Sequence, residues 1–395
     1  MKITIILNQP YPYGMACTNR IHLYAKRFRE RGNDVEIIVP KPTESHRTPV
    51  RNTERTGVYD GIKFWYPVKP ARSSSFFKRR VDDVFSYFKT LSYVLRKRRG
   101  SDILLLVDTR FYMGLTYKLF CVFTGCKLVA EKSELPFVFS KKTPLTKVFH
   151  RFYEKYFFRW YDGVIVISNS LFKYFGERVG KKTKLIIVPI LTDSSVFKPT
   201  PGNSGEIVYA GVLNQFKDGI FDLLQAYNDF KENTPGKKLV LMGDINLSPD
   251  KNEVNRFIDE NNLQQDVEIT GYVSRQAMID RLTNAAVLVL AKPANQQAEH
   301  CIPTKLAEYL STGKPVLTTK TGSIPMFLTD QKDAYLAEPN NPDHLAEKLQ
   351  TIFSNYEEAE VIGANGRSVA LEQFEYSAQG DRIISFFEQM IKNNV

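Results

Sequence analysis

The sequence predicts an α/β protein with two domains, each built around a parallel β-sheet. Its 395 residues are too many for one ordinary hydrophobic core and suit two domains of about 200 residues each. Apolar segments of strand length alternate with helical patterns along the chain. This alternation is interrupted at residues 199–205, PTPGNSG, which we interpret as the linker between the domains.

The first predicted domain, residues 1–198, opens with a β-branched strand, a turn-rich loop and an amphipathic helix that ends before Gly32. Such a strand–loop–helix–strand start is typical of a parallel sheet. The predicted elements are strands at 2–7, 34–39, 102–107, 127–130 and 163–167, a hairpin around Asp60-Gly61 within 58–68, and helices at about 17–31, 76–95, 113–123 and 145–161.

The second predicted domain, residues 199–375, restarts the same rhythm. Its predicted elements are strands at 206–211, 237–243, 267–271, 286–291 and 315–318, and helices at about 219–233, 252–261, 274–283 and 303–312. We expect an irregular polar run before the last of these helices, and a final helix at about 376–392.

Composition narrows the class of protein. With 43% hydrophobic and 25% charged residues the chain is globular. No apolar run approaches the roughly 20 residues that span a bilayer, and the N-terminus enters a strand directly, so we expect a cytosolic or membrane-peripheral protein. The four cysteines and five histidines lack metal-site spacing, and Gly14 is the one glycine of its loop, so we expect neither a metal nor NAD.

The charge is divided unevenly between the two halves. Residues 1–200 contain 37 lysines and arginines against 16 aspartates and glutamates, a net charge of +21, whereas the remainder has a net charge of −10. The first half is therefore expected to meet an anionic partner, such as a membrane surface, a phosphorylated lipid or a nucleic acid. No nucleic-acid-binding motif accompanies this charge, so we do not expect the last of these.

The residues that we expect to bind a ligand lie in one segment, residues 299–316, EHCIPTKLAEYLSTGKPV. A helix that begins after a loop offers unpaired amides and a positive dipole end to an anion. Lys305 and Glu308 lie one turn apart on this helix, where they offer a cation for phosphate and a carboxylate for the hydroxyls of a ribose. A solvated surface ion pair is the alternative that these two residues alone leave open.

The run PTKLAEYLSTGKPV resembles the nucleotide-sugar-binding signature of retaining glycosyltransferases of family 4, which have the GT-B fold of two Rossmann-like domains facing each other across a cleft. The resemblance implies that Glu308 holds the donor ribose and that the helix start, formed by Pro303, Thr304, Lys305 and Leu306, holds the diphosphate. The first glutamate of the family motif falls at His300, with Glu299 beside it. We expect one of these two to contact the donor sugar.

Further segments extend the resemblance. The turn YAGVLNQFKDG matches a family motif in which Gly211 opens the loop and Lys217 neutralises the donor phosphates, although Val212 stands where an arginine is common. Tyr272 corresponds to a position beside the nucleotide base, and Gly14 to one that approaches the donor diphosphate or the acceptor. The family also implies that the final helix crosses back onto the first domain.

Several residues of the first domain are candidates for the acceptor side. Glu131 and Glu134 follow a strand, at a place where family members face the acceptor, although helix capping or surface charge would explain them equally well. Arg20 either reaches the cleft or faces solvent.

The helix at 76–95 has an aromatic face and basic ends, which suit a membrane interface or a helix packed on the sheet with solvated ends. The residues that we expect at a membrane or acceptor are Phe76, Phe77, Lys78, Arg79 and Arg80.

Together these features predict a metal-independent retaining glycosyltransferase. We expect it to move a sugar from a nucleoside diphosphate sugar, a UDP-sugar by preference, to a lipid-linked saccharide in surface polysaccharide biosynthesis, at the inner face of the cell membrane. No cofactor is expected, and the nucleotide sugar is a substrate. Two alternatives remain, a non-catalytic membrane-associated partner of another enzyme and a nucleotide-sugar epimerase.

Overall fold

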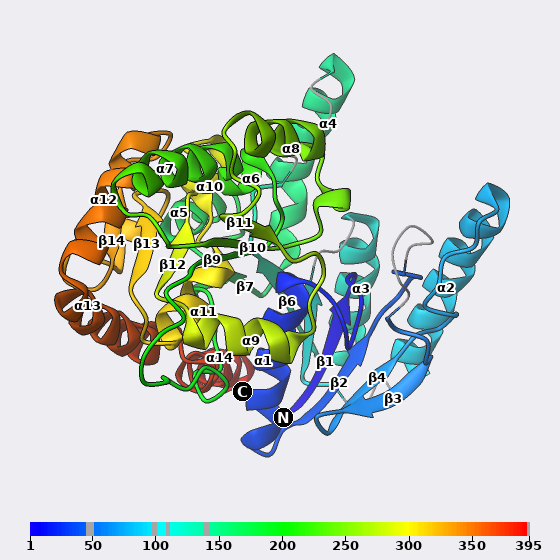
Figure 1. The fold of residues 1–395 in the computed structure, drawn as a ribbon. Coiled ribbons are helices and arrows are strands. Elements are labelled where there is room, and N and C mark those ends of the chain that lie inside the picture. Colours follow the sequence, from blue (N-terminus) through cyan, green and yellow to red (C-terminus); the bar gives the residue numbers. More distant parts are fainter. Residues whose placement is uncertain (45–50, 97–100, 108–110, 137–142, 393–395) are drawn as a thin grey trace. The chain divides into compact units, whose positions relative to one another are not determined.

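The computed structural model describes residues 1–44, 51–96, 101–107, 111–136 and 143–392 (Figure 1). The chain forms two compact units. Unit 1 comprises Met1–Pro189 with Tyr376–Val395, and unit 2 comprises Ile190–Glu375. Each is a mainly parallel sheet covered by helices, which confirms the predicted α/β class.

Unit 1 is built on a sheet in which the described strands follow the order β3-β4-β2-β1-β5-β6-β7-β8. All neighbouring strands are parallel except β3 and β4, which form the predicted hairpin. The central strands are buried on both faces, as their mostly apolar sequences indicate. The strands are β1 Lys2–Leu7, β2 Asp34–Ile38, β3 Thr56–Tyr59, β4 Ile62–Trp65, β5 Ile103–Val107, β6 Lys127–Lys132, β7 Gly163–Val166 and β8 Lys184–Ile187.

Helices cover both faces of this sheet. The described helices of unit 1 are α1 Ala16–Glu30, α2 Phe76–Arg96, α3 Phe111–Thr124, α4 Pro144–Tyr156, the 3₁₀ turn η1 Phe157–Trp160, α5 Asn169–Gly176 and α14 Tyr376–Lys392. The chain moves one way along the sheet through α1 and the other way through α2 to α5. Because such crossovers are right-handed, α1 lies on one face and α2 to α5 on the other.

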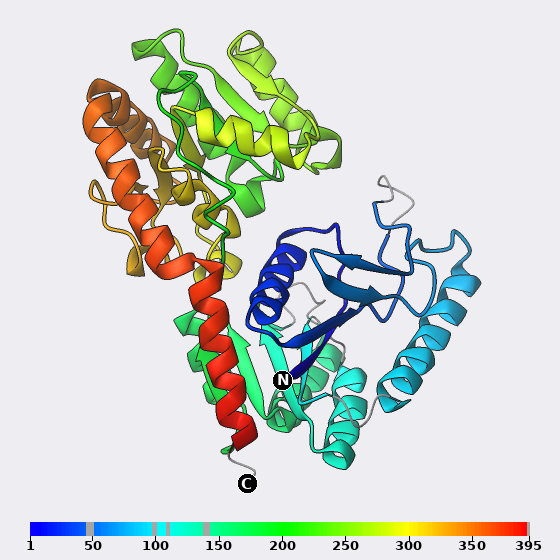
Figure 2. The same ribbon diagram turned by 90° about the horizontal axis from the view of Figure 1, so that it is seen from below.

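The last helix, α14, packs against α1 (Figure 2). Asp381 accepts hydrogen bonds from the guanidinium groups of Arg31 and Arg27, the latter at 2.6 and 2.8 Å. These two arginines, Arg31 most strongly, hold the pKa of Asp381 far below its usual range. The rings of Phe28 and Phe387 meet beside them with centroids 5.6 Å apart. The C-terminal helix therefore belongs to unit 1.

Unit 2 has a parallel sheet whose described strands follow the order β11-β10-β9-β12-β13-β14. The strands are β9 Ile207–Ala210, β10 Leu239–Met242, β11 Val267–Ile269, β12 Val287–Leu290, β13 Val316–Thr319 and β14 Tyr335–Ala337. The described helices are α6 Gln215–Asp218, α7 Ile220–Asn233, η2 Ile245–Leu247, α8 Lys251–Glu260, α9 Arg275–Asn284, α10 Gln296–His300, α11 Thr304–Ser311, η3 Ile324–Met326, α12 Pro342–Ser354, α13 Tyr356–Val369 and the π-helical turn η4 Ala370–Phe374.

The first boundary between the units lies after Pro189, earlier than the predicted boundary at 198–199. The segment that follows is hydrogen-bonded to the end of unit 2, where the backbone N–H of Thr192 donates to the carbonyl of Phe374 at 2.9 Å. The Pro- and Gly-rich residues 199–205 therefore lie inside unit 2. Their composition marks a surface turn and not the boundary itself.

Candidate functional site

The strand order of unit 2 identifies a site. Strands β10 and β11 follow β9 on one side of the sheet, and β13 and β14 follow β12 on the other side. Strands β9 and β12 are neighbours, so the strand order reverses between them. In open α/β sheets ligands bind at the carboxyl ends of strands at such a switch point. The segments that follow β9 and β12, with helices α6 and α11, contain most of the residues that the sequence predicted to bind a donor.

Helix α11 supplies a helix N-terminus to this site. It begins at Thr304 after Pro303, and no side chain caps its first turn. The helix is held from behind by Tyr309, which is fully buried and whose hydroxyl accepts the backbone N–H of Ala210 at 2.7 Å, at the end of β9. The N-terminus of α11 is thus fixed to the strand whose loop contains Lys217, and its dipole favours an anion.

Lys305 has a more specific environment than the sequence indicated. Its ammonium group donates to the Tyr209 hydroxyl at 2.8 Å and to the Asp218 carboxylate at 3.1 Å. It also lies over the Tyr209 ring, 4.5 Å from the centroid. Burial lowers the pKa of Lys305, and the Asp218 carboxylate opposes this shift. Lys305 therefore ties α11 to the loop after β9.

The same contact explains the glycine that opens this loop. A Cβ atom at Gly211 would collide with the ammonium group of Lys305 and with the Tyr209 hydroxyl. A side chain at this position would displace the lysine from its pair with Asp218. Gly211 is thus required by close packing within the site.

Lys217 lies at the surface of α6, the turn that follows Gly211. Asn214 caps this turn, because its side chain accepts the Lys217 backbone N–H at 2.9 Å. The Lys217 carbonyl accepts a hydrogen bond from the ammonium group of Lys292 at 2.6 Å. Lys292, which sequence reasoning missed, stands just after β12 and lowers the pKa of Lys305 further. Its place directly after a buried strand was the signal that could have identified it.

Glu308 contributes a second carboxylate to the site, besides Asp218. Its side chain is 23% exposed, and Arg275 lies 3.8 Å away at the start of α9. Burial raises the pKa of Glu308, while the positive charges of Arg275 and Lys305 lower it. A carboxylate in this position can accept hydrogen bonds from hydroxyl groups of a ligand. Arg275 was not predicted, since the sequence places it on a different helix.

The loop after β12 differs from the irregular run that we expected. Residues 296–300 form the short helix α10 because the side chain of Asn295 accepts the backbone N–H of Ala298 at 2.9 Å. Glu299 is exposed on this helix, and His300 is half-buried. Tyr272, predicted beside a nucleotide base, is 68% exposed in the loop after β11.

The predicted acceptor residues belong to unit 1, and two of them need correction. Arg20 and Glu131 are buried, each side chain 3% exposed, with the Arg20 Nε 3.0 Å from the Glu131 carboxylate. Arg20 also donates to the carbonyl of Val188 at 2.7 Å. Arg20 therefore does not face solvent, and Glu131 lies within β6 and not in the loop that follows it. Glu134 is exposed beyond the end of β6.

Gly14 lies in a tightly packed loop, and the predicted membrane residues are exposed on α2. A Cβ atom at Gly14 would collide with the side chain of Thr18 and the carbonyl of Pro10, so the loop requires glycine because it folds onto the start of α1. Phe76 and Phe77 are 65% and 77% exposed on α2. The basic residues that follow them, Lys78, Arg79 and Arg80, are exposed as well.

Two features are absent from the part of the chain that the structure describes. In that part of the chain, no three His, Cys, Asp or Glu side chains gather where they could share a metal ion. Likewise, none of the described helices has the length and hydrophobicity needed to cross a bilayer.

Comparison with known proteins supports this assignment. Residues 193–369 match the family described as "Glycosyl transferases group 1". An uncharacterized glycosyltransferase of Methanocaldococcus jannaschii is 25% identical over 54% of this chain and 57% of its own length. The lipopolysaccharide 1,2-N-acetylglucosaminetransferase of Salmonella typhimurium is 25% identical over 59% of this chain and 62% of its own length. Both alignments thus cover less than two thirds of the relative, and they confirm the resemblance drawn from the α11 motif.

The likeness in structure extends over nearly the whole chain. The Anabaena protein HepE, solved in complex with UDP-glucose, aligns with a TM-score of 0.70 and 15% identity over 98% of this chain and 100% of its own. At that identity the comparison concerns the fold. It confirms the expected GT-B architecture of two parallel-sheet domains.

Proposed function

We propose that this chain, a family 4-like glycosyltransferase of the GT-B fold, transfers a sugar from a nucleoside diphosphate sugar to a lipid-linked saccharide. The observation that carries the proposal is the switch point of unit 2, where Lys305 at the start of α11 is electrostatically coupled to Lys292 and Glu308, and Lys292 binds the Lys217 carbonyl. A nucleoside diphosphate needs positive charge for its phosphates and a hydrogen-bond acceptor for its ribose.

In the proposed reaction the bond between the anomeric carbon of the donor sugar and the diphosphate oxygen breaks. The hydroxyl oxygen of the acceptor forms a new bond to that carbon on the same face, and its proton passes to an oxygen of the departing diphosphate. Lys217 and the N-terminus of α11 stabilise the negative charge on this leaving group. Since the chain supplies these charges itself, the proposed reaction needs no metal ion.

Other residues are proposed to hold the substrates. His300 or Glu299 contacts the donor sugar in place of the first glutamate of the family motif, and Tyr272 lies against the base. Gly14 and Glu134 of unit 1 serve the diphosphate and the acceptor. These roles rest on the family resemblance and stay predictions.

The names of similar proteins support the choice of substrates. HepE was solved with UDP-glucose, which favours a UDP-sugar as donor. The Salmonella relative acts on lipopolysaccharide by its name, which favours a lipid-linked saccharide as acceptor in surface polysaccharide biosynthesis. Such an acceptor would bring the protein to the inner face of the cell membrane.

The experiment is an assay of hydrolysis and transfer across UDP-, GDP- and ADP-sugars. We expect the wild type to turn over one or more UDP-sugars, and Lys217→Ala to be strongly impaired. The control Lys238→Ala should keep its turnover, because Lys238 is an exposed lysine of the same unit outside the site. A well-folded protein that neither binds nor turns over any nucleotide sugar would overturn the proposal and favour the non-catalytic alternative.

A further inference from the structure

Helix α2 packs on the sheet of unit 1 through a narrow, largely polar edge. Its buried residues are Ser86, Thr90 and Val94, spaced one helical turn apart. The Ser86 hydroxyl donates to the carbonyl of Pro40 at 2.6 Å. Two turns further along the helix, the Tyr93 hydroxyl donates to the carboxylate of Glu36 on β2 at 3.0 Å. In α2 the polar edge therefore faces the sheet, whereas most helices turn their polar edge to solvent.

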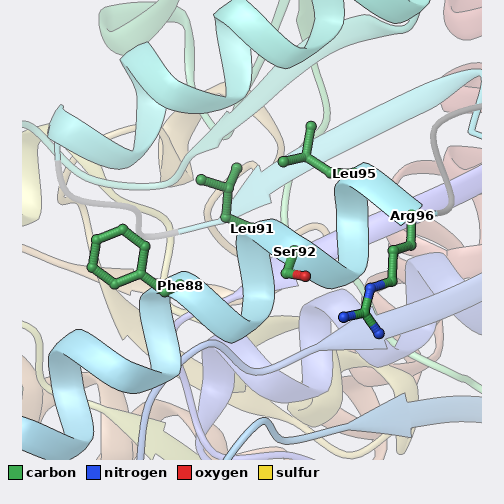
Figure 3. Close-up of a pocket in the computed structure, with 5 residues that line it drawn as sticks. All are labelled: Phe88, Leu91, Ser92, Leu95 and Arg96. Atoms are coloured by element: carbon green, nitrogen blue, oxygen red, sulfur yellow. The ribbon is translucent and has the colours of Figure 1, made fainter.

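The aromatic face of α2 consequently points outward. Seven large apolar residues of α2 are between 44% and 77% exposed, namely Phe76, Phe77, Val81, Val84, Phe85, Phe88 and Leu95. The far end of this face is hollowed into a groove of about 570 Å³ (Figure 3). Its lining is Phe88, Leu91, Ser92, Leu95 and Arg96. An apolar surface of this extent is rare on a soluble monomer and indicates a binding surface.

The neighbouring helices continue the pattern. Leu115, Leu119, Val122 and Phe123 of α3 are 43% to 86% exposed, and Val148, Phe152 and Tyr156 of α4 are 42% to 65% exposed. In both helices these positions recur every three or four residues, so each set forms one stripe. Helices α2, α3 and α4 cover the same face of the sheet, and the side chains of Tyr87 and Thr116 join α2 to α3.

Cations are interleaved with these aromatic side chains. The guanidinium group of Arg80 lies 5.2 Å from the ring centroid of Phe76, and the ammonium group of Lys89 lies 4.4 Å from that of Phe85. On α4 the ammonium group of Lys155 lies 5.3 Å from the Tyr156 centroid. Lys97, Arg98, Arg99 and the side chain of Arg151 lie outside the described residues.

Exposed apolar side chains interleaved with cations favour one kind of binding partner for this surface. A second copy of the chain would bring like charges together, which disfavours a symmetric contact. An anionic bilayer surface instead attracts the cations and receives the apolar side chains, as it does with amphipathic helices that lie in the interface. We propose that the outer stripes of α2, α3 and α4 together form one membrane-binding face for anionic lipid.

The biological role of this face rests on the proposed function, because the face would hold the enzyme at the membrane that contains a lipid-linked acceptor. Its physical basis lies wholly within unit 1, whereas the donor residues lie in unit 2. Membrane binding and nucleotide binding are therefore separate measurements. A protein that binds UDP but not vesicles would lack this face, and one that binds vesicles but no nucleotide would lack the proposed activity.

The test is cosedimentation with phosphatidylcholine vesicles that contain or lack phosphatidylglycerol. We expect the wild type to bind the anionic vesicles at low salt and to be released as salt screens the charges. The double variant Val122→Ser and Phe123→Ser should bind about tenfold more weakly, because two apolar side chains no longer enter the interface. The side chains are 67% and 86% exposed, so their replacement leaves the core of unit 1 intact.

A matched control is available in unit 2. Val361 and Leu247 are 61% and 62% exposed, and the variant Val361→Ser with Leu247→Ser should bind vesicles as the wild type does. Negligible binding of the wild type to anionic vesicles, or equal binding of the α3 variant and the control, overturns the proposal. Light scattering tests whether this face instead joins two copies of the chain. A wild-type dimer that dissociates in the α3 variant, with no vesicle binding, would overturn the proposal and make this face a contact between copies.

Discussion

The pair formed by Lys305 and Asp218 should contribute more to folding than a phosphate-binding lysine does. The two side chains are 23% and 9% exposed, and the Lys305 ammonium group has Asp218 and Tyr209 as partners. Replacing Lys305 with alanine leaves a buried carboxylate without its cation, a change that costs about 3–5 kcal/mol in fully buried pairs. Because part of the lysine remains exposed, we expect a loss of about 2–3 kcal/mol in the free energy of unfolding.

Thermal unfolding measures this loss directly. A domain of this size loses about 2–4 °C per kcal/mol, so Lys305→Ala should unfold about 5–10 °C below the wild type. Combining Lys305→Met with Asp218→Asn removes the unpaired charge and should recover most of the stability, but not binding of a nucleoside diphosphate. If Lys305→Ala unfolds at the wild-type temperature, the pair has no structural role and the reasoning fails.

Four further variants test the remaining assignments. Lys217→Ala should lower kcat/KM about a hundredfold, or about 3 kcal/mol, at an unchanged unfolding temperature. Glu308→Ala should raise the Kd for UDP about tenfold to a hundredfold in calorimetry, and an unchanged Kd would remove Glu308 from the site. Arg20→Met strands the Glu131 carboxylate, so the urea midpoint should fall by an amount equivalent to about 3 kcal/mol; a surface arginine would show no such fall. Asp381 has a pKa lowered by Arg31 and Arg27, so its pairs stabilise the fold above its unfolded pKa of about 3.9 and are lost as pH falls below it. The stability difference between wild type and Asp381→Asn should therefore shrink below about pH 4, and a difference independent of pH would contradict this.

Local patterns were enough to predict most of the architecture. The strand at Lys2–Leu7 and the helix at Tyr376–Lys392 have the predicted bounds. Hydrophobic periodicity and caps are properties of a few consecutive residues, so a sequence displays them directly. The α11 motif belongs to the same class, because its helix start, lysine and glutamate lie within one segment.

Contacts between distant segments could not be predicted in this way. Lys305 is 87 positions from Asp218 and 96 from Tyr209, and nothing in either segment indicates the other. The sequence therefore predicted Lys305 as a cation for phosphate and did not indicate its partner Asp218. The same limit applies to Lys292, whose contact with Lys217 spans 75 positions.

The orientation of α2 was also left open, because a period of apolar residues defines a face without stating where that face points. A second signal was present in the stripe Ser86, Thr90 and Val94. Small and β-branched side chains one turn apart allow a helix to approach a sheet closely, and here they lie opposite a row of phenylalanines. Considering both edges of the helix would have favoured the outward aromatic face.

Glu131 shows how two residues of strand length change a functional assignment. The predicted strand ended at 130, which left Glu131 in a loop at the edge of the sheet, where ligands bind. The actual strand β6 continues to Lys132, and Glu131 is paired in register with Val107 and Ile165 on its two neighbours. A side chain inside the sheet must meet the helix layer, and a carboxylate buried there requires a cation, which Arg20 of α1 supplies. Glu134, which lies beyond the end of the strand, is the carboxylate that we still predict on the acceptor side of this loop.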